Sequence, residues 1–377
     1  MKGAINISTV LGTRPEAIKF AILLKKLKQI KNINTKIILT GQHEKPVKEI
    51  FNIFGIKEDL NFNIMKHQQS LSYITSTVLN KLENEFEENK PDIVMVQGDT
   101  SSAFAAALAA FYKKIPVAHI EAGLRTNNIY NPYPEEINRK LISQLSTLHF
   151  APTNKCAANL KQEGIKNFIK ITGNTVIDSL LYIEKNEADK IKGKNFCSKD
   201  YILVTIHRRE NWGKPLEEIA KGILLIIKKH KDINIVIPMH PNRLVRDTLI
   251  KILSNHKRIN LIEPLNYVDF IFAIKNCKLI LTDSGGIQEE APSFGKPVLV
   301  LRNNTERVEV LESGNAKLVG TEPQNIFNLT NEVLENKKEY NNMSKKINPF
   351  GDGFASDMII EYLLNFLDSE IKNSNKS

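Results

Sequence analysis

The chain has 377 residues, with 52 Lys and Arg against 42 Asp and Glu, which gives a formal net charge of +10. Hydrophobic residues make up 42% and charged residues 25% of the sequence. This is the composition of an ordinary soluble globular protein, and it excludes the disordered, collagen-like and disulfide-framework classes. At about 150 residues per domain, the length predicts two domains.

The sequence predicts neither secretion nor membrane insertion. The first apolar run is short and leads into a charged loop, not into a small-residue cleavage site. The longest apolar run, near Ala103–Tyr112, has about half of the roughly 20 residues that a membrane span needs. Cys156, Cys197 and Cys277 are far apart and form no CxxC pair. We therefore expect a reduced, cytoplasmic protein without structural zinc.

The positive charge is spread out along the chain. Lysines recur on predicted helical faces, as in 25–28 and 228–231, without a long basic block or a stripe of interleaved aromatic residues. This pattern favours a solvated surface over nucleic-acid binding. A moderately positive field would still favour an anionic small substrate.

Apolar strands alternate with helices through the first half of the chain, which predicts a parallel sheet covered on both faces. The expected strands are 4–11, 35–40, 92–97 and 116–120, and the expected helices are 14–30, 44–54, 71–89 and 101–112. The polar stretch 184–200 then reads as a linker or surface hairpin.

The alternation resumes after this stretch. Strands are expected at 201–205, 234–238, 260–263, 279–282 and 297–301, and a helical tail near 355–366 precedes a frayed end at 373–377. Residues 96–123 and 281–302 also share one order of strand, polar turn, helix and strand. We interpret the chain as two related Rossmann-like α/β domains, with the functional site in the cleft between them.

Polar clusters follow almost every predicted strand, at the sheet edge where ligands usually bind. They comprise Arg14/Glu16/Lys19, Asp99/Thr100, His119/Glu121/Arg125, His207–Glu210, His240/Asn242, and Asp283–Gly286 with Glu289 and Glu290. Asp99 and Glu121 follow adjacent strands, so we expect both to face one pocket. The three histidines of these clusters show no short-range spacing typical of metal ligands.

The stretch Asp283–Gly286 opens a helix, where exposed backbone N–H groups suit a phosphate. A simple helix cap is the alternative. Arg14 and Lys19 near the first helix suit a diphosphate, and His207 could donate to a phosphate or cap a buried carbonyl. Neither GxGxxG nor GxxxxGK[ST] occurs, which argues against a dinucleotide fingerprint and a P-loop.

Taken together, these motifs resemble the non-hydrolysing UDP-N-acetylglucosamine 2-epimerase family. The matching stretches span nearly the whole chain: GTRPEAIK (12–19), TGQH (40–43), QGDT (97–100), HIEAGLRT (119–126), PYPEEINRK (132–140), TGNTVID (172–178), HRREN (207–211), MHPN (239–242), TDSGGIQEE (282–290) and TERVE (305–309). Each is weak alone, but together they are highly specific.

The resemblance implies a glycosyltransferase-B-like fold. The first domain would cover 1–173, the UDP-binding domain 174–354, and the C-terminal helix 355–377 would pack back onto the first domain. The resemblance implies no metal, no nicotinamide and no other cofactor. It also implies a homodimer that acts on a UDP-sugar, without a nucleic-acid or membrane partner.

The resemblance also assigns residues by motif. Asp99, Glu121 and Glu135 would be the acid/base carboxylates near the sugar, Arg139 would orient that group or touch the substrate, and Glu290 would bind the uridine ribose. The diphosphate would be held by Arg14, Lys19, His207, Ser284, Gly285, Gly286 and Arg307, with His240 close by.

In the mechanism that the resemblance implies, UDP is eliminated to leave 2-acetamidoglucal, and re-addition after protonation on the opposite face gives UDP-N-acetylmannosamine for surface polysaccharides. A hydrolysing 2-epimerase, a 2-epimerase of a related UDP-sugar, a glycosyltransferase and a non-catalytic UDP-sugar-binding regulator are the alternatives.

The sequence departs from the family pattern in a few positions. Val308 replaces the proline of TERPE, and we expect a local backbone change there. Many bacterial members bind a second UDP-sugar as activator; Gln42, His43 and Arg209 keep that pattern here, whereas Lys45 and Gln68 depart from it.

Overall fold

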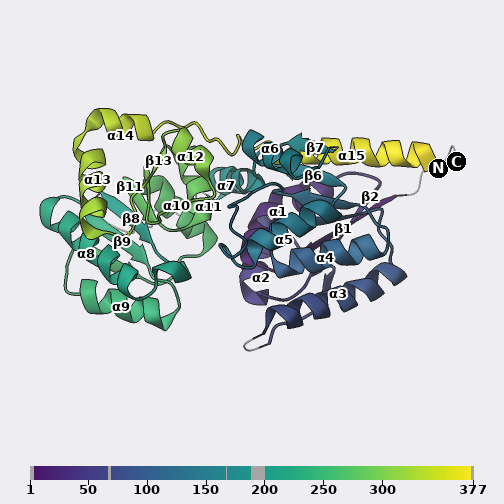
Figure 1. The fold of residues 1–377 in the computed structure, drawn as a ribbon, viewed down its shortest axis with the longest axis horizontal. Helices are drawn as coiled ribbons and strands as arrows, with labels where there is room; N and C mark the ends of the chain where they lie inside the picture. The colour runs from purple at the N-terminus through teal and green to yellow at the C-terminus, as the bar shows by residue number, and fades with distance from the viewer. Residues whose placement is uncertain (1–3, 67–68, 167, 188–199, 375–377) are drawn as a thin grey trace. The chain divides into compact units, whose positions relative to one another are not determined.

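The structure is a computed structural model that describes residues 4–66, 69–166, 168–187 and 200–374. The chain divides into two compact units, which are considered one at a time (Figure 1). Unit 1 comprises Met1–Ser179 and Phe350–Ser377, and unit 2 comprises Leu180–Pro349. The expected polar linker lies mostly outside the described residues, except that a helix continues to Asn186.

Unit 1 contains a seven-stranded parallel sheet in the order β3-β2-β1-β4-β5-β6-β7. The strands are β1 (Ile5–Leu11), β2 (Ile33–Leu39), β3 (Leu60–Asn61), β4 (Ile93–Gln97), β5 (Val117–Ile120), β6 (Leu148–Ala151) and β7 (Ile169–Ile171). The strand order reverses direction between β1 and β4, and ligands usually bind at such a switch point in doubly wound sheets.

Helices cover both faces of this sheet. α1 (Arg14–Leu27) contacts α2 (Glu44–Phe54) and α15 (Ala355–Ser374). α4 (Ser101–Tyr112) lies between α3 (Leu71–Glu88) and α5 (Glu135–Leu145), as Figure 1 shows. α6 (Asn154–Gln162) and α7 (Thr175–Asn186) complete the helices of this part of the chain. The buried alanines of α4 allow it to pack closely against its neighbours, because small side chains let the backbones approach.

Unit 2 repeats the same design with a six-stranded parallel sheet in the order β10-β9-β8-β11-β12-β13. The strands are β8 (Tyr201–Thr205), β9 (Asn234–Pro238), β10 (Ile259–Ile262), β11 (Leu279–Thr282), β12 (Val298–Val300) and β13 (Ala316–Leu318). The switch point lies between β8 and β11, the counterparts of β1 and β4.

The helices of unit 2 enclose a core of buried aliphatic side chains. They are α8 (Lys214–Lys229), α9 (Arg243–Leu253), α10 (Tyr267–Asn276), α11 (Gly285–Glu290), α12 (Val308–Glu312), α13 (Pro323–Glu335) and α14 (Lys337–Met343), with 3-10 turns at Arg209–Asn211 and Ala291–Phe294. The sequence prediction of two parallel α/β sheets is therefore confirmed, whereas the short strands β3, β6, β7 and β13 were not predicted.

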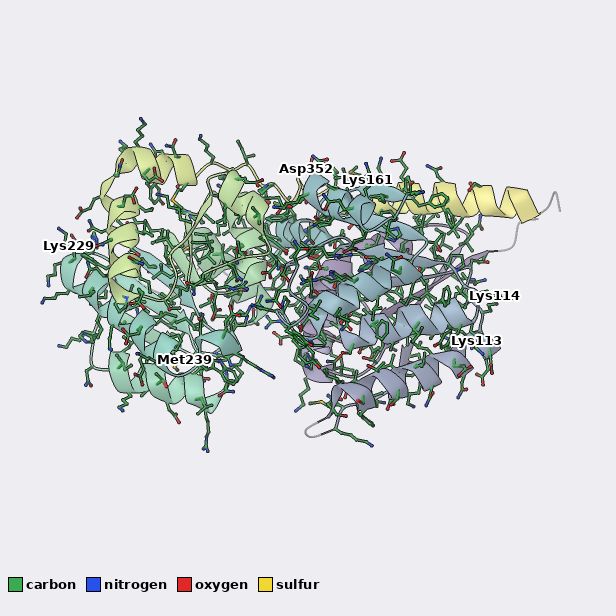
Figure 2. All side chains as sticks on the ribbon, viewed as in Figure 1. Lys113, Lys114, Lys161, Lys229, Met239 and Asp352 are labelled. Atoms are coloured by element: carbon green, nitrogen blue, oxygen red, sulfur yellow. The ribbon has the colours of Figure 1, made fainter. Side chains whose placement is uncertain are left out.

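Several surface lysines are paired with nearby carboxylates. Lys113 at the end of α4 forms ion pairs with Glu83 and Glu87 of α3, and Lys229 pairs with Glu335 of α13. Figure 2 labels both lysines at the surface. Such exposed pairs contribute little to stability. Among the described residues, no helix has the length and apolar content that a membrane span requires.

The loop after β5 passes very close to α6, and glycine makes this possible. Gly123 has φ +91°, and a Cβ placed there would lie 2.2 Å from the carbonyl oxygen of Cys156. Gly164, at the end of α6, also has positive φ (+87°), but a Cβ there would meet no atom within 4 Å. Both glycines thus have a left-handed backbone, but only Gly123 has no room for a side chain.

We predict that Gly123→Ala lowers the free energy of unfolding by about 3 kcal/mol, because it combines left-handed strain with a backbone collision. Gly164→Ala should cost only about 1 kcal/mol, since it carries the strain alone. Urea denaturation followed by circular dichroism measures both. Equal losses in the two variants would show that the contact with α6 is unimportant.

Candidate functional site

Two of the predicted acids follow neighbouring strands of unit 1. Asp99 comes after β4 and Glu121 comes directly after β5, and these strands pair in parallel register, with Gln97 opposite Ile120. The prediction that these carboxylates follow adjacent strands is confirmed. Both therefore lie at the carboxyl edge of the sheet, where side chains from different loops meet.

Glu121 is buried and surrounded by hydrogen-bond donors. Its backbone is left-handed (φ +64°), which is uncommon for a residue with a side chain. Its carboxylate accepts from the Lys19 ammonium, from Nε2 of Gln97 and, at 2.8 Å, from Nδ2 of Asn174. The structure thus pairs Lys19, expected to hold a diphosphate, with a carboxylate.

Asp99 has a different partner. Its Oδ2 accepts from Nε of Arg139 at 2.8 Å and lies 2.7 Å from the second guanidinium nitrogen. Arg139 itself is buried and also pairs with Glu136 at 3.1 Å. Asn138 donates to the Asp99 carbonyl at 2.9 Å. α5 therefore holds the Asp99 loop through two consecutive residues.

The two acids at the start of α5 have different environments. Glu136 is fully buried and accepts from the backbone N–H groups of Thr126 and Asn127 at 3.0 and 3.1 Å. The predicted acid Glu135 is only partly buried and is the first residue of the helix. Glu136 was not identified from the sequence. The one feature that could have indicated it is the pair of consecutive acids at the start of the helix.

Glu16, in the first matched motif, connects the loops after β1 and β4. Its carboxylate accepts from the backbone N–H groups of Gly12 and Thr13 and from the Thr100 hydroxyl, at 2.7–3.0 Å. Burial raises the pKa of Glu16, while these donors act in the opposite direction. The Thr13-x-x-Glu16 capping-box pattern could have revealed this role from sequence. Arg14 is partly buried nearby, and its Nε has no hydrogen-bond partner among the described residues.

His119 lies within β5, as the predicted strand 116–120 implied, although the sequence grouped it with the polar residues that follow that strand. Burial lowers the pKa of His119 to about 3, so the imidazole is neutral at ordinary pH. Its Nε2 lies 2.7 Å from the carbonyl oxygen of Gly98 and can donate to it. His119 thus supports the turn that carries Asp99. Arg125, grouped with it in sequence, pairs with Glu163 of unit 1.

The residues that match the activator pattern are split between the units. Gln42 follows β2 and its Oε1 accepts from Ser102 at 2.9 Å, while His43 is exposed at the N-cap position of α2 and makes no side-chain capping hydrogen bond. Arg209 is exposed in the 3-10 turn of unit 2. Gln68 lies outside the described residues.

In unit 2, Asp283 organises the loops at the switch point between β8 and β11. This fully buried carboxylate accepts from the backbone N–H groups of His207 and Arg208 and from Nδ2 of Asn211, at 3.0–3.1 Å. His207 Nδ1 lies 3.0 Å from it. Burial alone would raise the pKa of Asp283, but His207 and these donors hold it below its usual value. Because Nδ1 of His207 faces Asp283, Nε2 is the ring nitrogen that can bind a ligand.

His240 lies beside His207, with ring centroids 6.3 Å apart and nearly parallel rings. Burial lowers the pKa of His240, and His207 adds to this effect. His240 Nδ1 accepts from the backbone N–H of Asn242 at 3.2 Å. Two imidazoles from the ends of β8 and β9 are thus adjacent.

The predicted phosphate-binding turn begins α11. The Ser284 N–H donates to the Thr282 hydroxyl at 2.9 Å, while the Ser284 hydroxyl makes no capping hydrogen bond. A Cβ on Gly285 would lie 2.9 Å from the guanidinium carbon of Arg307, whereas one on Gly286 would approach nothing closer than 3.9 Å. A side chain on Gly285 would therefore have to shift the Arg307 guanidinium, whereas Gly286 leaves the turn open.

Arg307 is held by two buried acids. Its Nε donates to Glu289 at 3.0 Å, and its guanidinium also pairs with Glu306. Glu306 pairs further with Arg302 at 3.0 Å and with Arg208 at 3.4 Å. Burial would raise the pKa of Glu306, but the three guanidiniums hold it well below its usual range. The network was not apparent from sequence.

Two further positions can be assigned locally. Glu290 is buried and accepts from the Tyr267 hydroxyl at 3.2 Å. Val308 is the first residue of α12, a position where proline is also well tolerated. The helix therefore accommodates either residue, and the expected backbone change is not needed to explain the departure.

The two units present different chemistry. Unit 1 offers carboxylates at strand ends, which can transfer protons, whereas unit 2 offers imidazoles, a glycine turn and a guanidinium, which suit an anion. Among the described residues, no group of three or more His, Cys, Asp or Glu is arranged to hold a metal ion.

Comparison with known proteins gives the same family along almost the whole chain. The family model described as UDP-N-acetylglucosamine 2-epimerase matches residues 25–364. The UDP-N-acetylglucosamine 2-epimerase of Bacillus subtilis is 46% identical over 361 residues, covering 96% of this chain and 95% of the relative.

Solved structures agree with the sequence match. A UDP-GlcNAc 2-epimerase from Neisseria meningitidis, bound to UDP-GlcNAc, has a TM-score of 0.91 and 45% identity, covering 96% of this chain and all of that one. A structure from S. aureus with UDP has a TM-score of 0.88 and 46% identity, covering 97% of each chain.

A glycosyltransferase from Rickettsia africae, 14% identical with a TM-score of 0.61, shares the fold alone and covers 99% of this chain and all of that one. The fold is thus one that epimerases and glycosyltransferases have in common. The length and identity of the family match decide between them: the chain belongs to the UDP-N-acetylglucosamine 2-epimerase family, whose members are isomerases acting on a sugar nucleotide.

Proposed function

We propose that this protein interconverts UDP-N-acetylglucosamine and UDP-N-acetylmannosamine without hydrolysis. The observation that carries the proposal is the pair of carboxylates, Asp99 and Glu121, at the ends of adjacent strands, each with its own cationic partner. Carboxylates placed in this way can transfer protons to and from a bound sugar.

The reaction needs both a proton acceptor and a stabilised leaving group. The C2 hydrogen of the sugar is not next to a carbonyl, so its removal must be coupled to breakage of the C1–O bond. A carboxylate takes the C2 proton, the C–H electron pair forms the C1–C2 double bond, and the C1–O pair leaves with the UDP oxygen. Protonation of the resulting 2-acetamidoglucal on the opposite face and re-addition of UDP give the epimer.

Unit 2 is proposed to bind the UDP portion. His207 would donate through Nε2 to the diphosphate, beside the open turn at Ser284 and Gly286. Glu290, next to the Tyr267 hydroxyl, would accept from the ribose hydroxyls. His240 would lie close to the same group, and Arg307 would add positive charge behind Gly285. Positive charge and N–H donors stabilise the departing diphosphate.

Unit 1 is proposed to carry out the proton transfers. Asp99, Glu121 and Glu135 are the candidate acid and base groups, and Arg139 orients Asp99 through two short contacts. Arg14 has a buried Nε without a described partner, which is consistent with a guanidinium that meets an anionic substrate. Lys19 would act mainly through Glu121.

The remaining expectations come from the family resemblance. We propose a cytoplasmic homodimer that needs no cofactor and supplies UDP-N-acetylmannosamine for surface polysaccharide. Gln42, His43 and Arg209 are proposed as part of an activator site for a second UDP-sugar.

Turnover in D2O tests the proposal directly. With UDP-N-acetylglucosamine and neither acceptor nor metal added, we expect reversible formation of UDP-N-acetylmannosamine with deuterium at C2. Proton NMR follows both the isotope and the product. Free N-acetylmannosamine would establish the hydrolysing alternative, and an unchanged spectrum would rule out both.

Replacing the proposed acids should separate chemistry from binding. Asp99→Asn and Glu121→Gln should each lower the exchange rate by about a thousandfold or more, because neither amide can transfer the proton. UDP affinity, measured by calorimetry, should change little. Asp92→Asn is the matched control, since Asp92 precedes the same strand β4 at its opposite end. Near-normal exchange in either variant would remove that acid from the mechanism.

The UDP portion should depend on His207. We expect His207→Gln to raise the dissociation constant of UDP about tenfold, because a charge-assisted hydrogen bond to the phosphate is lost. His230→Gln serves as the control, since His230 lies at the end of α8 and faces Asn331. Calorimetry with UDP measures both. Equal affinities for the two variants would exclude a phosphate contact by His207.

A further inference from the structure

The Glu121 carboxylate is held from three separate segments of unit 1. Lys19 reaches it from α1, Gln97 from the end of β4, and Asn174 from the loop before α7. The motif that contains Asn174 was matched in sequence, but no role was assigned to the residue. Its Nδ2 lies 2.8 Å from Oε1 of Glu121 and its side chain is buried.

The orientation of the Asn174 amide is fixed by its own surroundings. Its Oδ1 accepts from the backbone N–H of Val176 at 3.1 Å, as in an Asx turn. Its backbone N–H donates to the carbonyl oxygen of Phe350 at 2.6 Å, where the chain returns to unit 1. Because the amide oxygen already faces a donor, the amide nitrogen must face Glu121.

All three of these groups donate to the carboxylate. An ammonium and two amide N–H groups stabilise the ionised form and a single rotamer of the side chain. An ionised carboxylate accepts a proton and cannot supply one, so this arrangement favours Glu121 as the base of the resting enzyme.

We propose that Asn174 is a positioning residue that holds the Glu121 carboxylate ionised and aimed at the substrate. This inference rests on the proposed proton transfer by Glu121. Asn174 would not touch the reacting atoms. Its loss should therefore slow the chemical step while leaving UDP binding, which is assigned to unit 2, nearly unchanged.

The key variant is Asn174→Asp, which keeps the shape and the acceptor for Val176 but replaces the donor with a second acceptor. We expect kcat for epimerisation to fall about a hundredfold, with KM within about threefold of the original. Asn174→Ala, which removes the side chain without adding charge, should lose about tenfold in kcat.

Asn159→Ala is the matched control. Nδ2 of Asn159 donates at 2.9 Å to the Gly123 carbonyl, two residues beyond Glu121. The substitution therefore removes an amide hydrogen bond of similar length to the same loop. We expect its kcat to stay within about threefold of the original. Circular dichroism and UDP calorimetry on all variants report folding and nucleotide binding.

The outcomes are distinct. If the unmodified protein shows no conversion, the proposed function itself fails. If it is active and Asn174→Asp retains kcat within threefold, or Asn159→Ala loses as much as Asn174→Ala, the positioning role is overturned. Loss of folding or of UDP binding in both Asn174 variants would make the residue structural and would also overturn it.

Discussion

A carboxylate buried at the carboxyl edge of a parallel sheet must be matched by hydrogen-bond donors, and this requirement organises the loops of both units. An unmatched buried charge would cost several kcal/mol, more than a marginally stable fold can tolerate at several sites. Glu16 draws its donors from two loops, Glu121 from a helix, a strand end and a loop, and Asp283 from the loop after β8. The loops that carry the proposed chemistry are therefore fixed by the acids themselves.

The need for donors that are distant along the chain also explains which features could be predicted from the sequence and which could not. Alternation of apolar strands and helices is a local signal, so the two parallel sheets and the neighbouring positions of Asp99 and Glu121 could be predicted. Arg139, the partner of Asp99, was suggested only by the family resemblance, and the partners of Glu121 could not be predicted, because they are distant along the chain. Lys19 is 102 residues and Asn174 is 53 residues from Glu121.

In unit 2, a second group of buried carboxylates is neutralised by a network of several ion pairs. Glu306 lies among Arg208, Arg302 and Arg307, and Glu289 holds Arg307 from the other side. A guanidinium fixed in this way presents charge at a constant position, which suits electrostatic stabilisation of a leaving group, because no reorganisation is needed when the charge develops. A side chain at Gly285 would shift this guanidinium from its position.

Within unit 1, the carboxylates of Glu121 and Asp99 differ in their exposure and in the donors that contact them. Glu121 is nearly buried, with 6% of its side chain exposed and donors from three segments, whereas Asp99 is 23% exposed and relies on the Arg139 guanidinium. Epimerisation at one carbon requires proton transfer on both faces of the sugar ring, so two groups in different environments are more useful than two alike. The more strongly matched carboxylate suits proton abstraction. The less enclosed one keeps part of its surface open to a second proton-transfer partner.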